Sequence, residues 1–115
     1  MGRIEADPQG AAETVPYFLD LPEILVTLNT GGRKSTFLKI GISLELHEEA
    51  DASKIQQIMP RIIDSFQVYL RELRLDDLKG SAGMYRLNEE LLKRVNAAAT
   101  PTKINAVLFK EMLVQ

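Results

Sequence analysis

Cysteine is absent from this 115-residue sequence, and there is one histidine, His47. The lack of cysteine excludes disulfides, thiol nucleophiles and thiolate metal sites. A catalytic or metal-binding histidine needs polar partners, and none is evident around His47, so we expect it to be solvated at the end of a strand. No Gly-x-Ser-x-Gly or Ser-x-x-Lys nucleophile motif is present. These absences predict a protein that is not an enzyme and has no cofactor or metal.

The sequence also lacks a strong excess of positive or negative charge. The 14 basic and 16 acidic residues give a formal net charge of −2 and are scattered along the chain. No basic stripe suited to a phosphate backbone emerges, so nucleic acid is excluded as a partner. Acidic side chains gather in three short clusters, without the spacing of a calcium loop; we assign them to helix N-termini and surface. They are Glu48-Glu49-Asp51, Asp76-Asp77 and Glu89-Glu90.

Long apolar runs are missing too, and nothing approaches the ~18 residues that span a bilayer. What is present is a chain with 45% hydrophobic residues, which is enough for one core. Residues 1–16 are polar and without periodicity, and we interpret them as a flexible linker or lead-in. Residues 17–115 are expected to form a single domain, beginning with an extended segment around Tyr17 to Pro22.

The stretch LNTGGRKSTFLKI, residues 28–40, has the composition of a phosphate-binding loop. The spacing of a P-loop is not there, because Gly31 and Gly32 are adjacent and no helical pattern follows. Instead, alternate residues are apolar from Leu38 to Leu46, which is the period of a strand. Together with the apolar residues 24–28, this pattern predicts a β-hairpin with the glycines in its loop.

Two helical regions follow the hairpin. The first is predicted by apolar residues at three- and four-residue steps from Ile55 to Leu73, with Asp51 or Ser53 as the N-cap. Pro60 lies inside this pattern and should divide a short helix from a longer one near Met59, because proline lacks the N–H for one helical bond.

The second helix is expected from about Ser81 to Ala98, with Asn88 as a rival start. Residues 104–114 then indicate a strand that is apolar on both faces, which is typical of the middle of a sheet. We therefore expect Phe109 to be fully buried in a central strand. The order of elements predicts an α+β fold, with about three strands and two or three helices on one face.

Candidate site residues are few. Arg33 and Lys34, together with Ser35, could hold an anion in the hairpin loop. Asp64 lies one turn beyond Pro60 among apolar residues, where it could handle a proton or contact a partner. The simpler interpretation is an ion pair with Arg61, three residues earlier on the helix. Arg33, Lys34, Arg61 and Asp64 are our candidates for an interaction surface.

Residues 17–115 resemble the periplasmic domain of the FliL family, the flagellar basal-body-associated membrane proteins. The resemblance rests on the order and spacing of several short motifs. They are Leu21-Pro22, Leu38-Lys39, Pro60-Arg61-Ile62-Ile63-Asp64, Asp77-Leu78-Lys79-Gly80, Gly83 with Leu87, Leu91-Leu92 with Asn96, and Val107-x-Phe109 to Gln115. The chain departs from the family pattern in having no membrane helix before Tyr17, which suggests a fragment of a longer protein.

The resemblance implies a fold similar to the stomatin and prohibitin type. It also implies an inner-membrane protein with one transmembrane helix and this domain in the periplasm. Its expected role is a scaffold that self-associates head to tail in a ring, supports the flagellar stator and thereby aids torque, motility and chemotaxis. The alternative is a regulatory α+β domain that binds a small ligand through the anion site of the 30–35 loop. In either case the physical expectation is an interaction module.

Overall fold

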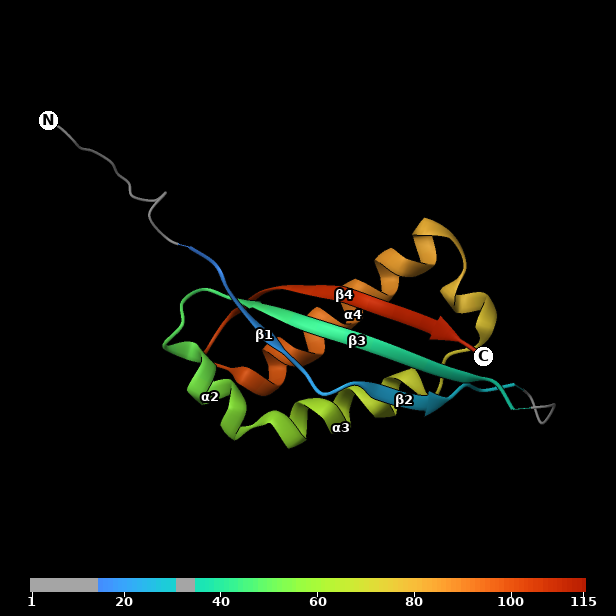
Figure 1. The fold of residues 1–115 in the computed structure, drawn as a ribbon, viewed down its shortest axis with the longest axis horizontal. Coiled ribbons are helices and arrows are strands. Elements are labelled where there is room, and N and C mark those ends of the chain that lie inside the picture. Colours follow the sequence, from blue (N-terminus) through green and yellow to red (C-terminus); the bar gives the residue numbers. More distant parts are fainter. Residues whose placement is uncertain (1–14, 31–34) are drawn as a thin grey trace, which may run out of the picture.

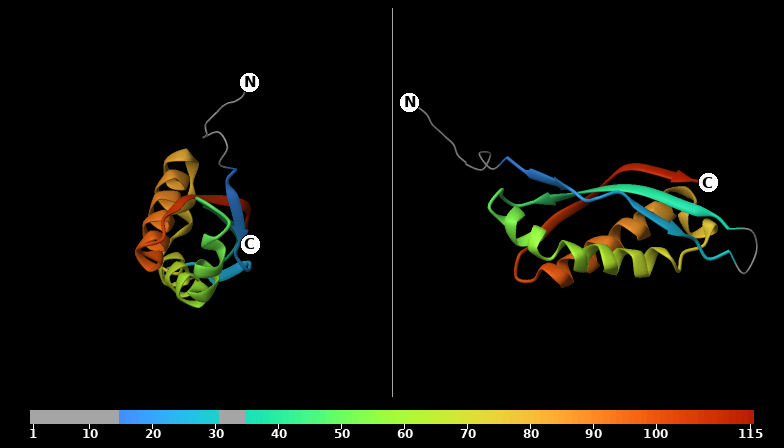
Figure 2. Two further views of the ribbon diagram at one scale, coloured as in Figure 1. Left: turned by 90° about the vertical axis from the view of Figure 1, so that its left-hand side faces the viewer. Right: turned by 60° about the horizontal axis from the view of Figure 1, so that its bottom comes forward.

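The computed structural model describes residues 15–30 and 35–115. Four strands form one sheet: β1 (Tyr17–Asp20), β2 (Ile24–Thr27), β3 (Phe37–Leu46) and β4 (Ile104–Val114). The helices are α2 (Asp51–Gln57), α3 (Met59–Leu70) and α4 (Gly80–Ala99), with a 3₁₀ turn, η1 (Leu75–Leu78), before α4. The predicted α+β class is confirmed, and the helices lie against one face of the sheet (Figures 1 and 2).

The ten-residue strand β3 is the centre of the sheet. All its neighbours are antiparallel: β1 and β2 follow one another along one of its edges, and β4 occupies the other edge. The predicted alternation is confirmed, because alternate residues of β3 point into the core and are at most 1% exposed. These residues are Leu38, Ile40, Ile42, Leu44 and Leu46.

The hairpin between β2 and β3 is also confirmed. Ile24 lies opposite Ile40 and Thr27 opposite Phe37. The tip of the hairpin, with Gly31, Gly32 and the site candidates Arg33 and Lys34, lies outside the described residues.

Proline 60 divides the first helical region as predicted. α2 ends at Gln57, α3 begins at Met59, and Ile58 between them leaves the helical region with φ −110° and ψ 13°. Pro60 therefore sits in the first turn of α3, where its missing N–H has no helical acceptor to lose. The expected N-cap was wrong: α2 is preceded by Ala50, with no side-chain cap, and Asp51 is its first helical residue.

Helix α4 spans nearly the range predicted from Ser81 to Ala98, so Asn88 is not a helix start. Its buried stripe faces the sheet. Near its start, Gly83 is required for close packing, because a Cβ there would lie 2.6 Å from the carbonyl oxygen of Asp77. This contact holds η1 directly against α4.

Two expectations about the sheet were wrong. β4 is an edge strand rather than a central one, since it pairs only with β3. Phe109 is accordingly only partly buried against the core. Residues 17–20, expected to be extended, form a fourth strand that pairs with residues 43–46 of β3.

Candidate interaction surfaces

The sheet face opposite the helices is the first candidate surface. No described element covers it (Figure 2), and each of its strands contributes at least one exposed apolar side chain. We call this surface the outer face; its exposed apolar residues are Phe18, Leu25, Phe37, Leu108 and Leu113. Apolar side chains exposed on one uncovered sheet face make that face a candidate for contact with other proteins.

Two ion pairs cross the outer face. Lys110 Nζ lies 2.8 Å from Asp20 Oδ2, joining β4 to β1 over the intervening β3. The hydrogen bond from Lys110 lowers the pKa of the Asp20 carboxyl below its usual value, with a smaller contribution from Ser43. Lys39 and Glu23 form a looser pair at 3.8 Å. The outer face is therefore amphipathic, with apolar side chains around paired charges.

The free edge of β4 is closed in its first half by asparagines from α4. The side-chain amide of Asn96 makes two bonds to Ile104: its Nδ2 donates to the Ile104 carbonyl at 3.1 Å, and its Oδ1 accepts from the Ile104 N–H at 2.7 Å. Asn88 Nδ2 donates to the Val107 carbonyl at 2.7 Å. These side chains replace a neighbouring strand and block pairing at this part of the edge.

The two long helices are clamped by Arg94. Its Nε lies 2.9 Å from Glu90 Oε2, and its guanidinium carbon lies 5.0 Å from the centre of the Tyr69 ring. Partial burial at this contact raises the pKa of the Tyr69 hydroxyl, and the nearby Glu90 carboxylate adds to the increase. The network is a structural contact between α3 and α4 and leaves the sheet surfaces unobstructed.

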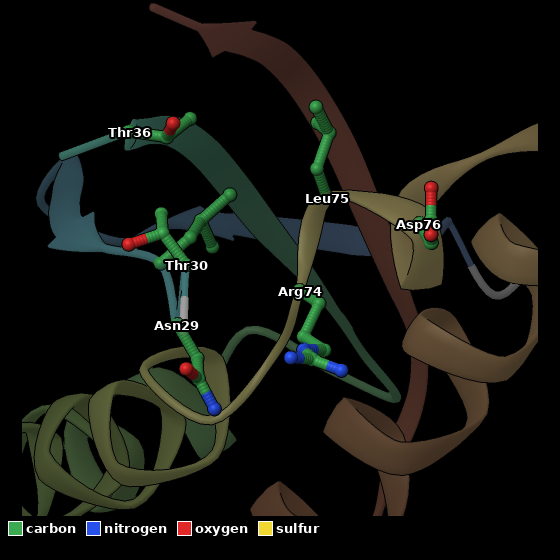
Figure 3. Close-up of a pocket in the computed structure, with 7 residues that line it drawn as sticks. Asn29, Thr30, Thr36, Arg74, Leu75 and Asp76 are labelled. Atoms are coloured by element: carbon green, nitrogen blue, oxygen red, sulfur yellow. The ribbon is translucent and has the colours of Figure 1, made fainter. Parts of the chain in front are cut away.

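An open cleft of about 740 Å³ lies between the base of the hairpin and η1. In Figure 3, Asn29, Thr30 and Thr36 lie on the hairpin side and Arg74, Leu75 and Asp76 on the other. The Arg74 side chain points away from Thr36. Arg74 and the hairpin threonines are therefore not arranged to bind one anion together. The predicted loop site at Arg33 and Lys34 remains a prediction, because both residues lie outside the described ones.

The other two site candidates lie on α3. Arg61 and Asp64 are both exposed, and within the described residues no ion pair joins them, contrary to the simpler interpretation of this pair. Their part in an interaction surface therefore remains a prediction.

The sequence-based reasoning did not select the outer face or the asparagine bonds to β4. Asparagine inside a helix was the available signal, because it is a poor helix former and often serves tertiary contacts.

His47 is exposed just after β3, as predicted. An open depression of about 450 Å³ at this end of the sheet is lined by His47, Lys54 and Lys103, among others. The residues that the structure describes contain no group of three or more acidic or histidine side chains placed to hold a metal ion. Among the same residues, no helix is both long and apolar enough to cross a membrane.

Comparison with known proteins identifies the family. The family model described as flagellar basal body-associated protein FliL matches residues 18–115. Two curated relatives named flagellar FliL protein, from Caulobacter vibrioides strains NA1000 / CB15N and ATCC 19089 / CIP 103742 / CB 15, are each 50% identical over 97 residues. The match covers 84% of this chain and 47% of each relative, so the chain spans about half their length. It belongs to the FliL family of flagellar basal body-associated proteins, which are structural proteins and not enzymes.

Proposed function

We propose that this domain is a scaffold of the flagellar basal body that self-associates and supports the stator, the membrane complex that drives rotation. Its place is the periplasm, tethered by a membrane helix upstream in the complete protein. The tether holds many copies close together, at an effective concentration in the millimolar range. Weak contacts between copies then suffice to hold a head-to-tail ring around the stator and maintain it in its working state.

The observation that carries this proposal is the uncovered outer face of the sheet. Its apolar side chains come from all four strands, with Phe18 48% and Leu25 59% exposed. A binding surface of this kind fits a protein partner better than a small ligand, which prefers an enclosed pocket. Two different lateral sides, with β4 on one and β1 and β2 on the other (Figure 1), are what head-to-tail association needs.

The test uses the complete protein in the flagellated bacterium that encodes it. Deleting the gene should lower the number of stator units on each motor, counted as speed steps of a bead attached to one flagellum. Restoring the wild-type protein should recover the steps. A variant with Phe18→Glu and Leu108→Glu, which charges the outer face without touching the core, should fail to recover them.

The matched control is Val68→Glu with Tyr85→Glu, which charges two exposed apolar residues of α3 and α4. We expect this variant to support wild-type speed. Equal stator numbers in the deletion strain and the wild type would refute the stator role. Equal loss in both glutamate variants would instead show that the outer face is not the surface concerned. Protein abundance should be compared in all strains.

A further inference from the structure

The last residues of β4 leave backbone groups unpaired. Phe37 N–H donates to the Gln115 carbonyl at 2.8 Å, and Gln115 N–H donates to the Phe37 carbonyl at 2.9 Å. In an antiparallel ladder every second residue makes such a reciprocal pair, so Leu113 pairs with Lys39 in the same way. The N–H and C=O groups of Met112 and Val114 therefore point away from β3, toward the free edge.

The same reasoning applies to β2, on the opposite side of β3. Leu28 N–H donates to the Thr36 carbonyl at 2.8 Å, which makes Val26 and Leu38 the next reciprocal pair. The N–H and C=O of Leu25 therefore point outward. Within the described part of the chain, these outward groups of Leu25, Met112 and Val114 have no hydrogen-bond partner.

The two open edges lie at the same level of the sheet. Leu25 and Leu113 are both opposite Lys39, one on each side of β3. The free edge of β4 is closed at Ile104 and Val107 by Asn96 and Asn88, and on the β2 side Asn29 N–H donates to the Leu73 carbonyl at 2.9 Å. The open segment of β4 is thus short and has a defined position.

We propose that copies of this chain join edge to edge, with β4 of one copy lying parallel to β2 of the next and Leu113 opposite Leu25. In this register, Leu25 N–H donates to the Met112 carbonyl and Val114 N–H donates to the Leu25 carbonyl, which is the bonding pattern of parallel strands. The register also places Leu25 and Leu113, which are 59% and 44% exposed, side by side on the outer face. One register therefore forms the hydrogen bonds in the correct directions and also keeps both leucine side chains on the same face of the joined sheet.

A second copy is the occupant that the geometry favours. β2 and β4 are both antiparallel to β3 and are therefore parallel to each other. Each copy consequently uses two different surfaces: its β4 edge pairs with the β2 edge of one neighbour, and its β2 edge pairs with the β4 edge of another. Such a contact repeats by rotation from copy to copy. A two-fold contact between two β4 strands would leave the β2 edge open. This inference rests on the self-association in the proposed function and specifies its contact.

The absence of cysteine permits a direct cross-linking test. Two single variants, Leu25→Cys and Leu113→Cys, are mixed at near-millimolar concentration, one of them carrying a mass tag, and oxidised mildly. Neighbouring strands are about 4.8 Å apart, within the Cα separation that a disulfide spans. We expect a tagged–untagged disulfide between positions 25 and 113, formed in several-fold excess over the disulfides of either variant alone.

The matched control mixes Phe18→Cys with Ala106→Cys. These residues are likewise both opposite one β3 residue, Glu45, but there the edge of β4 is closed by α4. We expect little cross-linking between them. Equal yields in the two mixtures, or mainly 113–113 disulfides, would overturn the proposed register. Thermal melts of all four variants should match the wild type, because a loosened sheet would expose both edges.

Light scattering of the wild-type chain at the same concentration separates the two proposals. If mass rises with concentration but positions 25 and 113 do not cross-link, self-association stands and this edge contact is wrong. If the chain stays monomeric at near-millimolar concentration and no cross-link forms, both fail.

Discussion

The two halves of β4 have opposite surroundings, although both are apolar in sequence. The first half, Ile104 to Val107, is packed under α4, and its free edge is closed by Asn96 and Asn88. The second half, Phe109 to Val114, has exposed side chains on the outer face and an open edge. One strand thus belongs to the core at its beginning and exposes apolar side chains at its end.

The two halves should differ most in how far a substitution in each lowers the free energy of unfolding. Ile104→Ala removes a side chain that is 1% exposed, and we expect a loss of about 2–5 kcal/mol in the free energy of unfolding. Leu113→Ala, at 44% exposure, should change it by less than about 0.5 kcal/mol. Urea melts of both variants measure the contrast. Similar losses would mean that the second half of β4 belongs to the core.

Asn96→Ala should have the next largest effect. It removes both bonds to Ile104 and leaves a backbone N–H and C=O without partners, which should cost about 1–3 kcal/mol. Asn96→Asp is the informative control, because its ionised carboxylate keeps the acceptor for the Ile104 N–H but has no donor, and protonation of the carboxyl restores one. It should be less destabilising than alanine at a pH where the carboxylate is partly protonated. Equal denaturant midpoints for Asn96→Ala and the wild type would show that these bonds do not close the edge.

Phe109→Ala tests the boundary between the halves. Because Phe109 is only partly buried, we expect a loss below the ~3–5 kcal/mol of a fully enclosed ring and above the ~0.5 kcal/mol of a surface position. The sequence alone, which placed Phe109 fully buried in a central strand, would have predicted the full ~3–5 kcal/mol. Denaturant melts alongside Ile104→Ala give the ranking directly, and a Phe109 loss equal to that of Ile104 would contradict it.

The boundary also shows what the sequence could and could not predict. Alternation along β3 and the helical stripes of α3 and α4 were predictable, because each element buries one face and is wetted on the other. β4 was misplaced because an apolar residue on both faces indicates burial but does not say against what. Leu108 and Leu113 are apolar on a face that no described element covers, which is the signal of a contact surface rather than of a central strand.

The candidate site was less predictable than the fold. Arg61 and Asp64 were chosen from local spacing on one helix, whereas the outer face combines residues from β1 to β4 that are far apart in sequence. Only the register of the strands brings them together. The asparagine bonds from α4 to β4 depend likewise on how the last strand returns along the helix, which helix periodicity does not specify.

The smallest expected effect concerns the ion pair that fastens the middle of β4 to β1. The Lys110 hydrogen bond lowers the pKa of Asp20 below 3.8, so the folded state favours the ionised carboxylate more than the unfolded state does. Its contribution is therefore complete above the unfolded pKa and is lost as the pH falls through the lower, folded value. Because both side chains are more than half exposed, salt should weaken the pair further. Thermal melts of the wild type and Asp20→Asn should differ slightly at neutral pH and low salt, and converge as the pH falls through the lowered pKa of Asp20 or when salt is raised. A difference that persists in acid would mean that Asp20 acts through its packing or through Ser43, and that its ion pair with Lys110 does not contribute to stability.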